Sequence, residues 1–428
     1  MWFWYNAMDK WRDKMEFCIL DKNEYQSFVE KHPYRDFMNS VNAMELKLMN
    51  HWQVDYVGVK DKGEILCATA LTSIPVMKVF RFYYAQRGFL IDYNDLELLK
   101  FFTVNLKKFL KDKKALYLTL DPNVLYKERD IDGNLVADGF DNSYVVDNLK
   151  AIGYQHQGFT NDFSVISEVR WMFSLYLEGK DENTLLKEMH QQTRWSVNKT
   201  IKQGIAIREL DIDEIGIFVR MMEHTAARRD FKARKQIFYE NQLKAFGDKA
   251  KILLAYLDLN DFNAKIEIEK NELEAEMATI QAKLAEMPNN KKFLNKAKVC
   301  QEALDLNVKK KTEAEELEKD YGPIIPMASS FFIIEDNEVV YLYSAAYDDF
   351  KKYNAPYAIQ WYMIRYALEH HINRYNFYGI SGNFSEDADD YGVYEFKKGF
   401  NGVVEELVGD FVLPICPIIY KLYKLLKH

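Results

Sequence analysis

The feature that most constrains the fold is a heptad repeat of apolar residues in a chain that otherwise alternates strands and helices. The repeat occupies residues 259–287, and charged residues fill most positions between its apolar members. Apolar residues at seven-residue steps form one stripe along a helix, which a second helix must cover. Pro288-Asn289-Asn290 predicts a turn, and a weaker stripe returns after it. The stripe residues are Leu259, Ile266, Leu273, Met277, Ile280, Leu284 and Met287, then Phe293, Ala297, Cys300, Leu304 and Val308.

This pattern predicts an antiparallel coiled-coil arm that protrudes from a folded domain. A free charged helix or a dimerising coil would need only the outgoing stripe. The turn and the return stripe instead allow the arm to cover its own seam.

The segments on both sides of the arm predict a mixed fold of strands and helices. Residues 54–60 and 64–73 flank Lys62-Gly63, which predicts a β-hairpin, and a helix at 96–113 leads to a buried strand at 115–120. This order predicts an α/β or α+β class. Further helices are expected at 183–202, 213–227, 234–246 and 357–371, and further strands at 78–85, 251–257, 328–335, 339–346 and 375–378.

Strands before and after the arm predict one sheet that an insertion splits. A chain of 428 residues, 48% of them hydrophobic, is long enough for two domains. Ordinary patterning begins only near Met15, so the preceding residues are expected to be an extension. The expected divisions are an extension at 1–14, a first domain at 15–157, a second domain at 158–257 and 322–410, the arm at 258–321 and a helical tail at 411–428.

Composition excludes several classes of protein. A net charge of −8 argues against a uniformly basic surface that coats nucleic acid, but it leaves room for a local basic groove. The four cysteines lie far apart and have no ligand spacing, so we expect neither a disulfide framework nor a metal site, and a reducing cytoplasm fits best. We find no apolar run long enough to span a membrane and no signal peptide.

Two residues stand out as candidates for chemistry, and no standard nucleophile motif accompanies them. Lys397 follows Phe396 on what the pattern indicates is a strand edge, where a fixed positive charge can face a phosphate or an oxyanion. Asp121 ends a buried strand before Pro122 and either forms a turn or faces a cleft. Taken alone, a lysine in this position is more often an ordinary surface lysine.

Two basic clusters with interleaved aromatic residues suit a phosphate backbone and stacked bases. The alternative for each is a solvated helix face. The clusters are Lys187, Arg194, Lys199, Lys202 and Arg208 around Trp195, and Arg228, Arg229, Lys232, Arg234 and Lys235 around Phe231.

Several longer motifs resemble the Fem family of peptidoglycan-bridge aminoacyltransferases. The chain is similar to the FemA and FemB branch and to the related MurM and MurN branch, and the likeness covers almost everything from Met15 onward. The motifs are residues 71–80, 86–93, 120–122, 353–361 and 375–410.

The resemblance implies a fold and a reaction. The fold would be two domains related to GCN5-type acetyltransferases, with the coiled-coil arm inserted in the second. The reaction would move glycine, alanine or serine from an aminoacyl-tRNA to the stem-peptide lysine of lipid II, or to the bridge growing on it. No cofactor is expected, because an aminoacyl ester is already activated.

The resemblance also implies roles for individual residues. Lys397, beside Phe396, would stabilise the tRNA end or the tetrahedral oxyanion, and Asp121 would orient or deprotonate the acceptor amine. Binding of the precursor would fall to Arg234 and Tyr343 for its phosphate and sugar, to Phe238 or Tyr239 at an aromatic position, and to Lys47 or Glu45 near the N-terminus.

The remaining expectations concern partners. The tRNA would meet only the basic clusters, through Arg194, Lys199, Lys202, Arg228 and Arg229, and the arm. Residues 418–427 mix apolar residues with lysines, so this tail either touches the inner membrane face or packs on its own domain. Related Fem proteins or a second copy are expected as further partners.

Two rival functions remain. An N-acyltransferase using acyl-CoA would share the fold, but it predicts a pyrophosphate loop that we do not find. A non-catalytic scaffold could use the arm to hold partners, but it gives no reason for Lys397, Asp121 and Arg234 to converge.

Overall fold

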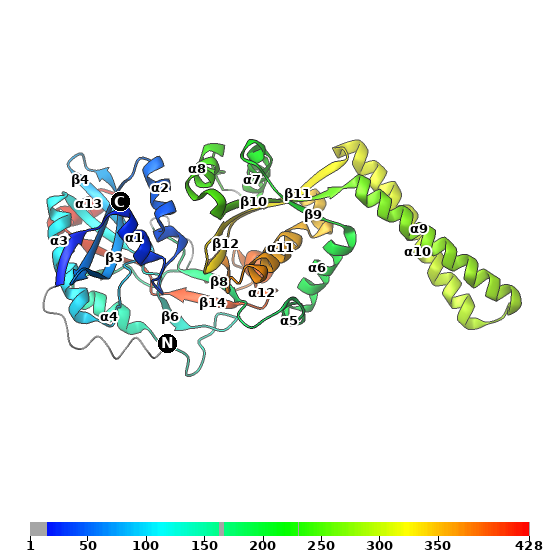
Figure 1. Ribbon diagram of the computed structural model, residues 1–428, viewed down its shortest axis with the longest axis horizontal. Coiled ribbons are helices and arrows are strands. Elements are labelled where there is room, and N and C mark those ends of the chain that lie inside the picture. The colour runs from blue at the N-terminus through cyan, green and yellow to red at the C-terminus, as the bar shows by residue number, and fades with distance from the viewer. Residues whose placement is uncertain (1–14, 162–166, 230, 428) are drawn as a thin grey trace.

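The computed structural model describes residues 15–161, 167–229 and 231–427, so the expected extension at 1–14 lies outside the described residues. These residues form two mixed sheets with helices around them and a long helical hairpin at one end (Figure 1). The predicted mixed α/β class is confirmed.

The first sheet has seven strands in the order β1-β2-β3-β4-β5-β15-β7. Neighbours are antiparallel except β4 and β5, which are parallel and joined by helix α3 (Leu96–Asp112). An apolar face of α3 that includes Phe102 and Leu106 is fully buried against the sheet. The strands are β1 (Met15–Ile19), β2 (Gln53–Asp61), β3 (Glu64–Val76), β4 (Phe80–Ala85), β5 (Ala115–Leu120), β7 (Gln155–His156) and β15 (Phe411–Pro414), and the other helices of this part are α1 (Lys22–Val29), η1 (Phe37–Asn39), α2 (Val41–Met49), α4 (Ser143–Ala151) and α13 (Pro417–Lys427).

The second sheet has eight strands in the order β6-β14-β8-β13-β12-β11-β10-β9. Its single parallel pair is β12 and β13, joined by α11 (Ala355–Glu369). The strands are β6 (Leu125–Glu128), β8 (Trp171–Tyr176), β9 (Ala206–Glu209), β10 (Ala250–Asp258), β11 (Ile324–Ile334), β12 (Glu338–Ala346), β13 (Arg374–Ile380) and β14 (Val403–Leu407), and the other helices are α5 (Glu182–Glu188), α6 (Gln191–Gln203), η2 (Ile212–Glu214), α7 (Ile215–Arg229), α8 (Gln236–Phe246), η3 (Gly247–Lys249), η4 (Asp348–Tyr353) and α12 (Tyr391–Lys398).

The two sheets repeat one arrangement. In the first, three antiparallel strands (β2, β3, β4) lead through α3 to the parallel strand β5, and in the second β10, β11 and β12 lead through α11 to β13. In the second sheet, the helical hairpin takes the place of the two-residue turn that joins the first two of these three strands in the first sheet. Lys62-Gly63 joins β2 to β3, whereas α9 (Leu259–Glu286) and α10 (Lys291–Tyr321) join β10 to β11.

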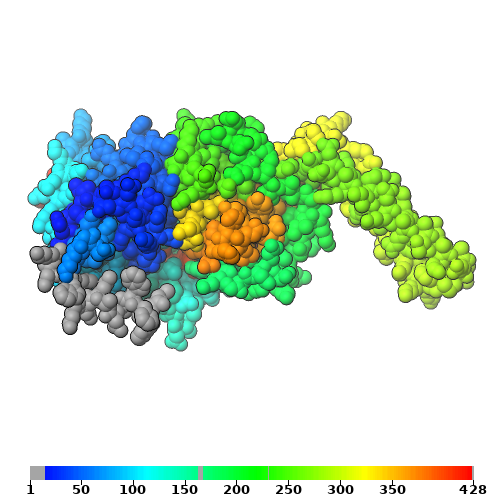
Figure 2. Space-filling model, in the orientation of Figure 1, coloured from blue at the N-terminus to red at the C-terminus, as the bar shows by residue number. Residues whose placement is uncertain are grey.

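The hairpin helices run antiparallel and stand clear of the body (Figure 2). Ile266 and Ile280 are buried in the seam as predicted. The prediction that Val308 lies in the seam is wrong, because its side chain is 60% exposed. The return stripe passes through Asn307 instead, whose amide donates to the Ile266 carbonyl at 2.9 Å. An asparagine at this position satisfies its own polar atoms across the seam.

The structure differs from the expected elements in several places. The helix expected at 183–202 is two helices, α5 and α6, which break at Met189 and His190. Lys397 lies on helix α12 and not on a strand edge. Two strands cross the expected domain boundaries: β6 pairs with β14 of the second sheet, and β15 pairs with β5 of the first. The segment 411–428 therefore begins as a strand before α13.

Candidate active site

Asp121 follows β5 directly and is buried where the two sheets meet. Its carboxylate accepts a hydrogen bond from the Tyr84 hydroxyl and another from the Arg87 backbone N–H, both at 2.8 Å. Burial raises the pKa of Asp121 to about 7, and the nearby Arg87 guanidinium offsets only part of that rise. The side chain can therefore accept or hold a proton near neutral pH.

Arg87 holds Asp121 in position through its backbone N–H and its guanidinium. The residue is 1% exposed and has a left-handed backbone, with φ of 56°. Its guanidinium donates to the Val169 carbonyl at 2.9 Å and lies 3.8 Å from Asp36 and 4.0 Å from Asp121. A buried cation between two carboxylates must stay charged, so this arginine anchors the loop after β4.

Glu168 joins the two sheets across the junction. Its backbone N–H lies 3.3 Å from Asp121, and its carboxylate accepts hydrogen bonds from Gln86 at 2.6 Å and from the Tyr378 hydroxyl at 3.1 Å. Tyr378 belongs to β13 and has a φ of 64°. Glu168 thus connects the end of β5 to the end of β13, which are equivalent positions in the two repeated units.

Sequence reasoning assigned no role to Arg87 or Glu168. Both are charged residues whose burial depends on partners from other segments. The only local signal was the polar pair Gln86-Arg87 directly after the apolar strand β4.

Lys47 lies at the same junction. Its ammonium is 5.1 Å from the Trp52 ring centroid and 6.0 Å from that of Tyr84, the residue that donates to Asp121. Burial lowers the pKa of Lys47, and the carboxylates of Glu168 and Asp121 offset part of that effect. Glu45, the alternative at this position, pairs with Lys22 near the surface.

Arg234, Phe238, Tyr239 and Tyr343 form one aromatic cluster. The Arg234 guanidinium lies 5.2 Å from the Phe238 ring, whose centroid is 6.0 Å from that of Tyr343. Tyr239 points into the core instead, and its buried hydroxyl has no hydrogen-bond partner among the described residues. Burial raises the pKa of Tyr343 to about 12, and Glu168 adds to that rise. The aromatic rings of this cluster pack in or against the same apolar core as Tyr378 of the junction.

Lys397 approaches the junction from the far side of β13. It is 3% exposed, and its ammonium donates to the carbonyls of Gly379 at 2.6 Å and Tyr378 at 3.3 Å. Burial lowers the pKa of Lys397 to about 7, and Asp390 offsets part of this. Lys397 and Asp121 do not touch, but both reach Tyr378, one at its carbonyl and the other through Glu168.

The neighbouring Phe396 faces away from the junction. Its ring packs against Tyr357 at 4.8 Å and Phe400 at 5.6 Å. It belongs to the edge of the apolar core of the second sheet.

One cation of each basic cluster contacts η4. Lys199, on α6, donates to the Lys352 carbonyl at 2.7 Å, and Arg228, on α7, pairs with Asp348 at 2.8 Å. Lys202 and Arg229 are exposed beside them, whereas Arg194 turns back to the Leu186 and Lys187 carbonyls. Cations from segments far apart in sequence therefore lie around η4, which itself carries Asp348 and Asp349, near the base of the hairpin.

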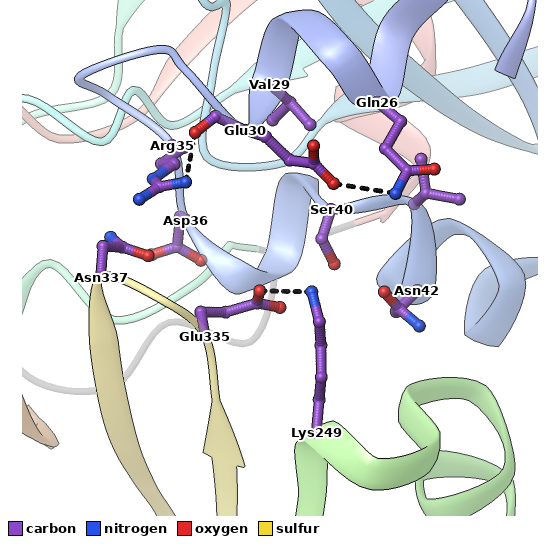
Figure 3. A pocket seen from close by; sticks show the side chains of 11 residues that line it. Gln26, Val29, Glu30, Arg35, Asp36, Ser40, Asn42, Lys249, Glu335 and Asn337 are labelled. Atoms are coloured by element: carbon purple, nitrogen blue, oxygen red, sulfur yellow. Dashed lines mark hydrogen bonds and ion pairs between the residues drawn. The ribbon is translucent and has the colours of Figure 1, made fainter. Parts of the chain in front are cut away.

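A small polar pocket lies behind the junction, between α1, η1 and the turn from β11 to β12 (Figure 3). Asp36 lines it, and Lys249 and Glu335 pair across it at 2.7 Å. Neither Asp121 nor Lys397 is among its lining residues, so this pocket is separate from the candidate site. Among residues 15–161, 167–229 and 231–427, we find no cluster of His, Cys, Asp and Glu that could hold a metal ion.

Comparison with known proteins shows the family of this chain. A sequence model of the FemAB family matches residues 20–428. The chain belongs to the FemAB family. Aminoacyltransferase FemA of Staphylococcus epidermidis is 37% identical over 414 residues, which cover 96% of this chain and 99% of the relative. Aminoacyltransferase FemA of Staphylococcus aureus is 36% identical, with 96% and 98% covered.

A solved structure agrees with this membership. The crystal structure of FemX superposes with a TM-score of 0.82 and 26% identity, covering 95% of this chain and 99% of that one. As a FemAB family member that matches aminoacyltransferases along nearly its whole length, the protein is an enzyme of the acyltransferase class. No helix within the described ranges is long and apolar enough to cross a membrane.

Proposed function

We propose that this protein transfers glycine, alanine or serine from an aminoacyl-tRNA to an amine of the peptidoglycan precursor lipid II. The acceptor is the stem-peptide lysine or a residue of the interpeptide bridge already attached to it. The observation that carries the proposal is that Lys47 lies beside Tyr84, which donates to Asp121, while Tyr343 packs against the same apolar core as Tyr378, in a member of the FemAB family.

The reaction is aminolysis of an ester. The acceptor amine loses a proton and attacks the aminoacyl carbonyl, a C–N bond forms, and the C–O bond to the terminal ribose breaks as the tRNA hydroxyl takes up a proton. Asp121 is our candidate to accept the amine proton, because burial brings its pKa to about 7. Tyr84 and Arg87 hold its two oxygens, which fixes the direction of attack.

Lys397 is our candidate to stabilise the oxyanion of the tetrahedral intermediate. Two of the three donors of an ammonium go to the Tyr378 and Gly379 carbonyls, which leaves one for the reacting oxygen. A buried positive charge is worth more there than in water. No cofactor is required, because the ester supplies the activation.

Charge supports the assignment of substrates to surfaces. Lys47, Arg234 and Tyr343 offer two cations and a hydroxyl for a precursor that carries phosphates and sugars. The surface around η4 offers Lys202 and Arg229 to a tRNA backbone.

A panel of donors tests the proposal. The purified protein is mixed with lipid II or its soluble nucleotide precursor and with either tRNA charged with radiolabelled glycine, alanine or serine, or labelled acetyl-CoA. We expect label on the precursor only from charged tRNA. Transfer from acetyl-CoA would favour the N-acyltransferase, and no transfer from any donor would favour the scaffold.

A further inference from the structure

Helix α13 buries only one of its two apolar faces. Tyr420 packs on Tyr117 of β5, with ring centroids 4.8 Å apart, and Tyr423 lies 6.0 Å from the same ring. No described residue covers the other face: Ile418 is 80% exposed, and Leu422, Leu425 and Leu426 are also exposed. Four large apolar side chains in water along one short helix are unusual for a surface without a partner.

The turn between β3 and β4 adds to this surface. Met77 and Val79 are exposed at its tip, beside the exposed Lys78. Residues at the two ends of the turn, Val76 and Phe80, pack in the same small apolar cluster as Tyr420. Figure 1 shows α13, in red, beside β4. The uncovered face of α13 and the tip of the turn therefore project from one region.

The two segments that form this surface carry charges of a single sign. Residues 411–428 and 74–82 contain no aspartate or glutamate, although the chain as a whole has a net charge of −8. Lys421 and Lys424 are exposed on α13, and Lys78 on the turn. Exposed leucines and isoleucines bordered by lysines fit a bilayer surface that presents acyl chains below a negatively charged headgroup layer.

We propose that α13 and the β3–β4 turn form a docking surface for an anionic lipid bilayer. A second copy of the chain is the competing occupant, but the lysines of one copy would then face those of the other. Anionic headgroups complement them instead.

The docking surface is joined to the candidate active site by a row of aromatic rings. Ring centroids step from Tyr420 to Tyr117 at 4.8 Å, to Phe82 at 4.9 Å and to Tyr84 at 6.3 Å, and the Tyr84 hydroxyl donates to Asp121. One region of the first sheet thus carries α13 at one end and Asp121 at the other. If the proposed function holds, this arrangement keeps the acceptor site close to the bilayer that holds a lipid-linked precursor.

Vesicle co-sedimentation tests the docking surface without any substrate. The full chain is spun with vesicles of phosphatidylglycerol and phosphatidylcholine, or of phosphatidylcholine alone, at low and high salt. We expect binding to the anionic vesicles, at least tenfold weaker binding to the neutral ones, and weakening by salt. The double variant Leu422→Glu/Leu425→Glu should lose at least tenfold in affinity, and Lys421→Glu/Lys424→Glu should lose the preference for anionic lipid.

The matched control is Leu96→Glu/Val104→Glu, which alters two exposed apolar residues on α3 and should bind like the wild type. All variants should keep the thermal midpoint of the wild type and its transfer of label to the soluble precursor, so that failure of docking and failure of the proposed function are distinguishable. The proposal is overturned if the wild type ignores anionic vesicles, or if Leu422→Glu/Leu425→Glu binds them unchanged. It is also overturned if light scattering shows that the wild type is a dimer and that Leu422→Glu/Leu425→Glu converts it to a monomer without changing its binding to vesicles.

Discussion

Burial gives Asp121 and Lys397 pKa values near 7, from opposite directions. The carboxyl is raised and the ammonium is lowered, because the junction disfavours a charge on either. Groups of opposite type whose pKa values approach neutrality are typical of acid–base sites. Each of the two makes a separate prediction.

Asp121→Asn should remove the acid limb of the pH–rate profile. If Asp121 accepts the amine proton, its ionisation at about pH 7 gives kcat/KM for the precursor an acid limb, and loss of the Lys397 proton, also with a pKa of about 7, gives a basic limb, so the wild-type profile is bell-shaped. The variant should lose about 10²–10³-fold in kcat/KM at pH 8. Initial rates between pH 5.5 and 9 check this, and a variant profile that keeps the limb near pH 7 would show that another group is the base.

Lys397 should make stability depend on pH. Its pKa is lowered in the folded protein, so between about pH 7 and pH 10 the unfolded chain binds more protons, and the free energy of unfolding rises with pH. Relative to Lys397→Met, the wild type should gain on the order of 3 kcal/mol over this window. Urea unfolding at pH 7 and 9.5 measures the free energy of unfolding of both proteins. An equal change with pH in the two proteins would contradict the lowered pKa of Lys397.

The sequence indicated which residues are candidates for the site better than it indicated what their side chains contact. Asp121 could be found because it directly follows a buried strand, and Lys397 because it lies among aromatic residues. The helix around Lys397 and the burial of Arg87 and Glu168 could not, because each depends on side chains from distant segments. The sequence around a charged residue does not indicate whether a side chain from a distant segment will pair with it.

At the scale of elements, the hairpin is an extension of a turn. Leu259 and Ala314 at its base belong to the core of the second sheet, whereas its outer part contacts only itself among the residues that the structure describes. The heptad stripe predicted this element because its contacts are local. Strands β6 and β15 were not predicted, since short segments acquire their partners only when the two sheets come together.

A variant lacking residues 267–306, closed by a short glycine-rich turn, should therefore fold. Ile266 and Asn307 would remain to cap the shortened hairpin. We expect a thermal midpoint within a few degrees of the wild type, measured by calorimetry. Loss of the cooperative transition would mean that the outer hairpin stabilises the body.

At the scale of the whole molecule, an acidic net charge is compatible with tRNA binding through exposed cations around η4, such as Lys202 and Arg229. Binding of tRNA through a few cations should weaken steeply with salt, because each phosphate contact releases counterions. Lys202→Ala/Arg229→Ala should lower the slope of log affinity against log salt by about 2. Filter binding at several salt concentrations measures this, with Lys31→Ala/Lys150→Ala, far from η4 in sequence, as the matched control. An unchanged slope in the first variant would place the tRNA elsewhere.

The central claim is that the junction between the two sheets transfers an aminoacyl group from tRNA to a precursor amine. Single-turnover transfer tests it most directly, with excess enzyme, tRNA carrying a labelled amino acid, and the soluble precursor. We predict that label moves from the tRNA to the precursor amine in the wild type, and about 10²-fold more slowly in Asp121→Asn. Label that stays on the tRNA, or leaves it as free amino acid at the same rate without precursor, would contradict the claim.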